Sequence, residues 1–279
     1  MTDITSRIER ALMERFGATI PVAADLPHAG ALARMLEHRS QRRYTPQPVG
    51  ADLLRLLFAC ALSAPSKSDL QQADIVHVSD GAARTAIADL IPDNPWVRNA
   101  PVFLVFCGNN RRIRQVAELR GKTFANDHLD AFMNAAVDAG IVMATFIHAA
   151  EAAGLGCCPI SSVRNHAQTV SNLLALPDWV FPVAGLCVGY PSEPGQITSR
   201  LPLEVTVHTD RFDEADIAAK IDAYDRRRNA RQQYKKQRDV GRFGAADFYG
   251  WSEDKARQYA KPERADFGAF IRGKKFNLT

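Results

Sequence analysis

The sequence lacks a cysteine framework of the kind that forms disulfides or binds a structural metal. Five occur in 279 residues, and no two stand in a C-x-x-C spacing. A disulfide framework uses an even number of cysteines, and a structural zinc site uses closely spaced ligand pairs. We therefore expect that the protein binds no metal and is cytoplasmic. We also expect its cysteines to be reduced thiols, at Cys60, Cys107, Cys157, Cys158 and Cys187.

Long hydrophobic runs are also missing. The longest extends from Ala139 to Ala150, twelve residues between Asp138 and Glu151, whereas a membrane-spanning helix needs about 20 apolar residues. The N-terminal stretch MTDITSRIERALMERFG has no apolar signal-peptide core and resembles an amphipathic helix instead. We expect a protein that does not enter a membrane.

Charge of one sign is not in large excess. The net charge is +4, with 46% hydrophobic and 24% charged residues, as in ordinary soluble globular proteins. This balance does not imply nucleic acid, and we expect none as a partner. The exception is 226–238 (RRRNARQQYKKQR), with seven basic residues in thirteen. It is a solvated helix face or a nucleic-acid-binding tail, and a salt-dependent shift with an oligonucleotide would distinguish the two.

Hydrophobic periodicity predicts helices and strands without regular alternation, which favours an α+β fold. Ser6 and Glu9 have capping-box spacing for a first helix that Gly17 can end. The residues from Asp213 onward are charged, poor in core-forming residues and mostly helical in pattern. The other expected elements are helices at 31–38, 52–63 and 129–153, an irregular turn at 92–101, and strands at 74–78, 101–107, 183–188 and 203–208.

Four polar segments stand out, and each has a simple alternative explanation. The segment HRSQRRY (38–44) has arginine side chains that suit phosphate oxygens. Alternatively, it is a charged turn at the surface. APSKSDLQ (64–71) can present amides and hydroxyls to a heterocycle, or only connects two elements. GLG (154–156) lets a backbone approach a ligand closely, or only stops a helix. VGYP (188–191) followed by SRLPL (199–203) holds an arginine that can clamp an anion, or one that lies at the surface.

Taken together, these segments resemble the nitroreductase family in order and spacing. Its members carry an [HR]RSxRx[FY] motif, an APSxxxxQ loop, a GLG turn after a long helix, an LGxP turn and a late RxPL segment. The resemblance covers about residues 31–212. It extends more weakly to 251–276 (WSEDKARQYAKPERADFGAFIRGKKF), which looks like the C-terminal extension of the larger NADPH-dependent, oxygen-insensitive nitroreductases and NADPH-flavin oxidoreductases.

The resemblance implies FMN as cofactor and NADPH or NADH as hydride donor. Arg42 would approach the N1/O2 edge of the flavin, where a cation stabilises the reduced form. The phosphate and ribityl positions correspond to His38, Arg39, Ser40, Arg42 and Arg200. The positions along the ring correspond to Ser66, Ser68, Asp69, Asn94, Pro159, Ile160, Ser161 and Ser162.

Two positions depart from the family pattern. Asp69 stands where many relatives have Asn, and a carboxylate would accept from flavin N3–H but repel the anionic reduced flavin. Thr198 stands where the larger nitroreductases often have a lysine, two residues before the late arginine. The loss of that cation weakens FMN binding unless His38 and Arg43 compensate.

The fold implied is a nitroreductase-like α+β sandwich, with a small mixed β-sheet flanked by helices. Two chains would form an intertwined homodimer whose FMN sites are made by both subunits. The apolar helix at 129–153 favours an interface independently, because one chain would struggle to cover it. The expected division is an N-terminal helical extension at 1–30, an FMN-binding domain at 31–212 and a C-terminal helical extension at 213–279.

The reaction implied is ping-pong hydride transfer from NAD(P)H, through FMN N5, to a small electron-poor acceptor such as a nitroaromatic, a quinone or a flavin. We expect no catalytic side chain, because the cofactor carries the chemistry. We expect NADPH to be preferred over NADH, because the basic segment 226–238 offers cations to its 2′-phosphate. The candidates are Arg228, Arg231, Lys235, Lys236 and Arg238.

Other functions on the same fold remain open. Some relatives remove halogen from aromatic rings, fragment flavin, or oxidise amides and heterocycles. A non-enzymatic flavin-binding or regulatory protein is a further alternative. Steady-state NAD(P)H oxidation, measured with and without a nitroaromatic, separates the enzyme from the binding protein.

Overall fold

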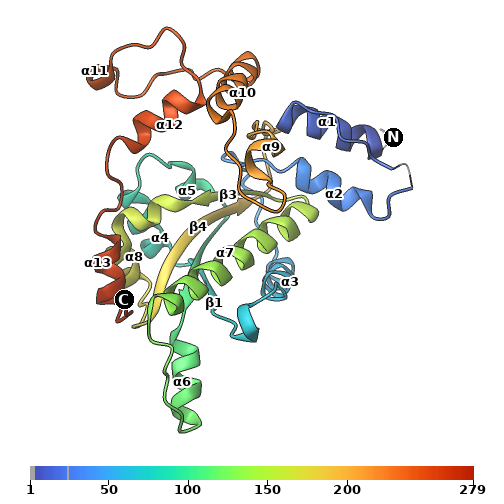
Figure 1. The fold of residues 1–279 in the computed structure, drawn as a ribbon. Helices are drawn as coiled ribbons and strands as arrows, with labels where there is room; N and C mark the ends of the chain where they lie inside the picture. Colours follow the sequence, from blue (N-terminus) through green and yellow to red (C-terminus); the bar gives the residue numbers. More distant parts are fainter. Residues whose placement is uncertain (1–3, 24) are drawn as a thin grey trace. The chain divides into compact units, whose positions relative to one another are not determined.

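A computed structural model of the chain describes residues 4–23 and 25–279, which form two compact units (Figure 1). We call Ser40–Gly195 with Arg264–Thr279 the core unit. We call Met1–Arg39 with Gln196–Glu263 the flanking unit. The three-part division expected from the sequence remains a prediction.

The core unit is built on a four-stranded sheet in the order β1-β2-β4-β3. The strands are β1 (Ala73–His77), β2 (Val102–Asn109), β3 (Gly156–Ile160) and β4 (Val180–Gly189). Every neighbouring pair of these strands is antiparallel. The expected mixed sheet is therefore wrong for the named strands, and parallel pairing in the described residues is limited to a bridge between Ser40 and Cys157.

Each face of the sheet packs on its own helical layer. Leu104 and Phe106 of β2 face α3 (Ala51–Leu62) and α7 (Leu129–Ala152). Phe103 and Val105 face the opposite side, because successive side chains of a strand alternate. The layer on that side contains α4 (Gly81–Leu90), α5 (Trp96–Asn99), the 3₁₀ helix η2 (Ser161–His166) and α8 (Ala167–Leu173). The resulting helix–sheet–helix layers confirm the expected α+β sandwich.

The long helix α7 runs along the sheet (Figure 1). By length and composition alone it could cross a membrane. Its buried side, however, includes Ala139 and Phe146 in the core and the fully buried carboxylate of Asp138. These contacts identify α7 as a core helix of this unit.

The C-terminal tail completes the core unit. Phe270 and Ile271 of α13 (Phe267–Gly273) and the nearby Phe276 pack against Phe181 of β4. The expectation that the tail contributes little to the core is therefore wrong, because three spaced apolar residues suffice to fill this cluster. The unit also contains η1 (Lys67–Asp69) and the surface helix α6 (Arg111–Leu119).

The flanking unit is helical in the described residues. Its elements are α1 (Ile4–Phe16), α2 (Ala29–Leu36), α9 (Leu203–Thr206), α10 (Ile217–Arg231), α11 (Val240–Phe243) and α12 (Trp251–Tyr259). Ile8 and Leu12 of α1 pack on Ala29 and Ala33 of α2. Ser6 lies inside α1, so the expected capping box is wrong, whereas Gly17 follows the helix with φ +68°, as expected.

The predicted strand at 203–208 is wrong. After Pro202, the residues Leu203–Thr206 form one helical turn. β-propensity describes how well a side chain fits a sheet surface, so a short β-rich run without a neighbouring strand does not stay extended.

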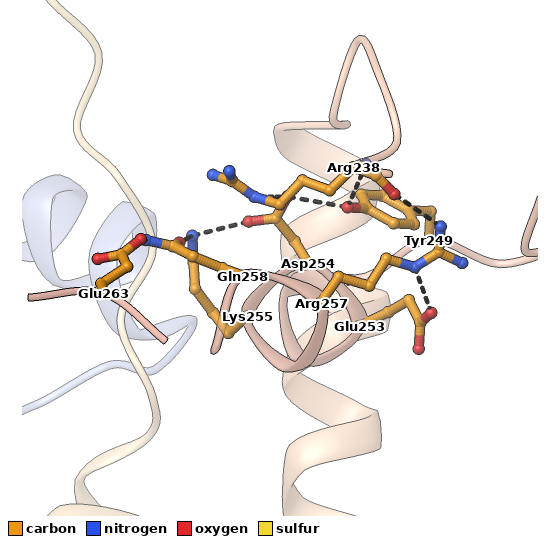
Figure 2. A network of polar contacts seen from close by, with 8 residues as sticks. All are labelled: Arg238, Tyr249, Glu253, Asp254, Lys255, Arg257, Gln258 and Glu263. Carbon is orange, nitrogen blue, oxygen red and sulfur yellow. Dashed lines mark hydrogen bonds and ion pairs between the residues drawn. The ribbon is translucent and has the colours of Figure 1, made fainter. Parts of the chain in front are cut away.

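A polar network holds the end of the basic segment (Figure 2). The buried carboxylate of Asp254 accepts hydrogen bonds from Tyr249 Oη at 3.0 Å and Arg238 Nε at 3.1 Å, and pairs with Lys255 Nζ at 2.7 Å. The buried guanidinium of Arg257 donates to the carbonyls of Arg238 and Gly244. The exposed Arg238 is therefore attached to buried partners of this unit.

Candidate functional site

The first predicted motif lies along the exposed edge of β3. Gln41 N–H donates to the Cys157 carbonyl at 2.8 Å, next to the parallel bridge that joins Ser40 to Cys157. Tyr44 forms an antiparallel bridge with Pro191, and Thr45 N–H donates to the Tyr190 carbonyl at 2.8 Å. The core unit thus brings the HRSQRRY, GLG and VGYP segments together.

The two glycines of GLG have local structural roles. Gly154 follows the end of α7 with φ +80°, a conformation that side chains disfavour. A Cβ at Gly156 would collide with the side chain of Gln41. Gly156 therefore allows the first motif to approach β3, and Gly154 ends the helix.

A cluster of predicted ring-contacting residues lies where β3 ends. Asn94 Nδ2 donates to Ser162 Oγ at 2.9 Å, and the Arg42 guanidinium lies 5.3 Å from the Trp96 ring centroid. Ser161 accepts from Arg264 at 3.5 Å, and Pro159 is exposed. The side chain of Ile160 is buried in the core, so only its backbone is open to a ligand.

The thiol beside this cluster is not a nucleophile. Burial raises the pKa of Cys158, and the nearby Arg42 cation only partly offsets that rise. A thiol with a raised pKa stays protonated at neutral pH and is unreactive. The cluster therefore offers hydrogen bonds, a cation and an aromatic face.

The APSKSDLQ loop is organised by Asp138 of α7. The Asp138 carboxylate accepts from Ser66 Oγ at 2.8 Å, Lys67 N–H at 3.1 Å and Gln72 N–H at 3.2 Å. Ser66 Oγ also accepts from Gln71 N–H at 2.7 Å. The Ser66 hydroxyl therefore positions the loop through one donated and one accepted hydrogen bond.

The tip of this loop adopts left-handed backbone conformations. Ser68, Asp69 and Gln71 have φ values of 50°, 56° and 51°. Such conformations cost free energy in non-glycine residues, and they gather at functional sites. Ser68 and Asp69 are exposed, and Asp69 accepts from Gln71 Nε2 at 3.1 Å.

A cavity of about 660 Å³ adjoins the loop, on the α3–α7 side of the sheet. Its lining includes Ser66, Asp69, Asp74 and the imidazole of His77, whose pKa is lowered by burial. The Arg42 cluster lies on the opposite side of the sheet and lines no part of this cavity. Within one chain, the structure therefore does not bring Ser66, Ser68 and Asp69 together with Asn94 and Ser162.

In the flanking unit, the late arginine lies in a cationic cavity. Arg200 is exposed, and its Nη1 donates to Thr198 Oγ1 at 2.6 Å. It lines a cavity of about 740 Å³ together with Arg228, Lys255 and aromatic side chains. The buried Ser199 Oγ and Arg227 Nη1 have no hydrogen-bond partner in the described part of the chain. Ser199 lines the cavity, whereas Arg227 does not and donates to the Arg200 carbonyl at 2.8 Å. The three cations that line the cavity suit a bound anion.

The start of the first motif belongs to the same unit. Arg39 Nε donates to the Glu37 carbonyl at 2.9 Å, and the His38 carbonyl accepts from Arg15 of α1. Arg15 also donates to the Thr198 carbonyl at 3.2 Å. The flanking unit therefore links His38 to the segment that carries Arg200.

Sequence reasoning missed Arg15, Trp96 and Asp138. A carboxylate in the middle of the apolar helix 129–153 was a signal for Asp138, because a buried charge needs hydrogen-bond partners. Arg15 gave no such signal, because an arginine in the last turn of an amphipathic helix is ordinary.

Comparison with known proteins gives consistent matches along the chain. Residues 35–190 match the model described as "Nitroreductase family", and residues 199–279 match "Nitroreductase family, C-terminal domain". An FMN reductase (NAD(P)H) of Bacillus subtilis is 34% identical over 230 residues, which are 81% of this chain and 90% of the relative.

Solved structures share the fold. The structure of B. megaterium NfrA2 has a TM-score of 0.81 and 31% identity, covering 89% of this chain and 98% of that one. NADPH:FMN oxidoreductase from Vibrio harveyi, complexed with NAD+, has a TM-score of 0.75 and 28% identity, covering 88% and 97%.

The role of Asp138 predicts a loss of stability on substitution. Asp138→Ala should lower the free energy of unfolding by about 3 kcal/mol, because it leaves buried donors of the loop unpaired. Urea denaturation measures this. The exposed Asp130 in the first turn of the same helix is the control, and Asp130→Ala should cost well under about 1 kcal/mol. Equal losses in the two variants would refute the role of Asp138.

Proposed function

The chain belongs to the nitroreductase family, and on that premise we propose that it is an FMN-dependent oxidoreductase that takes hydride from NAD(P)H. The observation that carries the proposal is the cationic cavity at Arg200. Arg200, which the motif register assigns to the FMN phosphate, lines this cavity together with two further cations, Arg228 and Lys255. Relatives named as FMN reductase and NADPH:FMN oxidoreductase support the same cofactor and donor.

Each unit, taken by itself, has residues that fit one part of FMN. Arg200, with His38 and Arg39 of the first motif, would hold the phosphate, since guanidinium forks suit phosphate oxygens. Arg42, stacked beside Trp96, supplies a cation for the polar edge of the ring. Asn94 and Ser162, joined by a hydrogen bond, would orient the ring. When bound, FMN accepts hydride and passes electron pairs onward.

The acceptor we propose is a small electron-poor molecule, such as a nitroaromatic, a quinone or a flavin, reduced in ping-pong order. The protein side chains need not transfer a proton or form a covalent bond in this scheme. The buried thiols and a cytosolic nicotinamide donor favour a cytoplasmic location.

The first test is the purified protein itself. We expect yellow protein with about one FMN per chain, released on denaturation, and NAD(P)H oxidation that a nitroaromatic, quinone or flavin accelerates. Absorbance spectroscopy and steady-state kinetics measure these. Protein that takes up no FMN at micromolar concentration would contradict the proposal, and FMN-loaded protein without NAD(P)H turnover would indicate a binding protein.

The separation of the APSKSDLQ loop from the Arg42 cluster favours a homodimer. One flavin cannot contact both sides of the same sheet, so we propose that the loop of one subunit completes the site of the other. Large apolar side chains also lie exposed near the loop, on α3 and α7. They are Leu56, Leu62, Leu129, Met133 and Val137. Their burial in an interface is favourable.

This arrangement predicts a dimer that persists at working concentration. Light scattering should give twice the chain mass of 30.7 kDa. Replacing Met133 and Val137 with glutamate should produce monomers that lose FMN, because charges would be buried at the interface. Val240→Glu, at an exposed residue of α11, is the control and should remain dimeric. A wild-type monomer with full activity would refute the dimer.

The five basic residues proposed to bind the 2′-phosphate of NADPH differ in their surroundings. Arg231 pairs with Glu14 at 3.4 Å and Arg238 with Asp254 at 3.1 Å, so both have internal partners. The guanidinium carbon of Arg228 lies 4.3 Å from the centroid of the Tyr234 ring, and Arg228 lines the cationic cavity. Lys235 and Lys236 are exposed. Because Arg228 shares the cavity assigned to the FMN phosphate, we propose that Lys235 and Lys236 recognise the 2′-phosphate of NADPH.

Neutralising these two cations should reduce the preference for NADPH over NADH about tenfold in kcat/KM, the effect of one charge-assisted contact. The double variant Lys235→Gln, Lys236→Gln is compared with Arg226→Gln, which removes an exposed cation paired with Asp222. FMN content should not change, because neither lysine lines the cavity of Arg200. A wild type that uses both donors equally, or a preference that survives the double variant, would show that this segment is only a solvated surface.

A further inference from the structure

The segment that carries Arg200 is held through four successive backbone carbonyls. Each accepts a hydrogen bond from a side chain of α1, α10 or the residue after α10. The donors to the carbonyls of residues 197, 198, 199 and 200 are Gln232 at 2.8 Å, Arg15 at 3.2 Å, Tyr224 at 3.2 Å and Arg227 at 2.8 Å. Arg200 N–H also donates to the Arg15 carbonyl at 2.7 Å. All of these residues belong to the flanking unit.

Arg15 is the donor that reaches beyond this segment. Its side chain is 6% exposed. Besides the Thr198 carbonyl, it donates through Nε to the Leu36 carbonyl at 2.9 Å and through Nη2 to the His38 carbonyl. One guanidinium therefore joins the end of α2, which leads directly into the first motif, to the segment of Arg200. A planar fork with several fixed donors can span three carbonyls, whereas a single ammonium cannot hold the same geometry.

Attachment of α1 does not explain this arrangement. Ile8 and Leu12 already bury the apolar face of α1 against α2, and Arg7 pairs with Glu37 at 2.6 Å. Arg15 lies past these contacts, at the C-terminal end of α1, where the open polar atoms of Ser199 and Arg227 also occur. Its three carbonyl partners belong to the segments that carry the proposed phosphate ligands.

We propose that Arg15 is a positioning residue of the phosphate site. It fixes the His38–Arg39 segment relative to Arg200, so that both segments contact one phosphate group. Helix α1 is then a functional part of the site, and its cation lies at the backbone of Thr198, where the family pattern leads one to expect a lysine. This inference rests on the proposed FMN function.

The test compares two flavins that differ in the phosphate. Apoprotein is titrated with FMN and with riboflavin, and flavin fluorescence gives both dissociation constants. Arg15→Met should raise the dissociation constant for FMN about tenfold and leave that for riboflavin unchanged. The selectivity for the phosphorylated flavin then falls. Arg15→Lys should behave in the same way, because it keeps the charge but loses the fork. Arg200→Ala, which removes a direct contact, should weaken FMN ten- to a hundredfold.

Arg7→Met is the matched control, because it breaks the other polar link between α1 and α2. Its FMN-to-riboflavin selectivity should equal that of the wild type. A general loosening of the protein would weaken both flavins together and leave the ratio unchanged. If Arg15→Met does not fold, the ratio measured for Arg15→Lys decides alone.

Two results would overturn the inference while leaving the proposed function intact. One is wild-type selectivity in the Arg15 variants, measured on protein that still binds FMN. The other is wild-type selectivity in Arg15→Lys together with lost selectivity in Arg15→Met, which would show that the positive charge at residue 15 matters and the guanidinium geometry does not. A wild type that binds neither flavin would instead refute the proposed function, and the inference with it.

Discussion

Burial of β2 on both faces is the constraint on which the rest of the core unit depends. All eight of its residues are buried, and alternate side chains face opposite helical layers. Because both faces of the sheet must be covered, polar motifs are confined to the β3 edge and to the loop after α3. This confinement places the Arg42 cluster and the APSKSDLQ loop on different sides of the sheet, and so favours a site completed by a second chain.

Much of the fold followed from local patterns, and the errors have physical causes. The apolar stretches 101–107 and 183–188 identified β2 and β4, and the predicted bounds of α7 agree with the structure to within a residue. β3 was missed because its sequence, GCCPI, contains glycine and proline and resembles a turn. Residues 203–208 looked like a strand, but strand formation depends on a partner that local sequence does not reveal.

The site was predictable as a set of motifs but not as a set of contacts. The hydroxyl of Ser66, which is predicted to line the flavin, donates to Asp138, 72 residues away in the sequence. Arg15 and Thr198 are separated by 183 residues. Such long-range hydrogen bonds leave no periodic pattern. Residues outside the motifs thus hold the segments of His38 and Arg200 through backbone carbonyls, which a motif does not encode.

If this chain transfers electrons through bound FMN, its two substrates bind in turn and the flavin is reduced in between. Anaerobic rapid mixing of the FMN-loaded protein with one equivalent of NADPH tests this. We expect the visible absorption of the oxidised flavin to disappear, and a nitroaromatic added after removal of the nicotinamide to restore it. A flavin that stays oxidised with both NADPH and NADH would refute electron transfer through FMN.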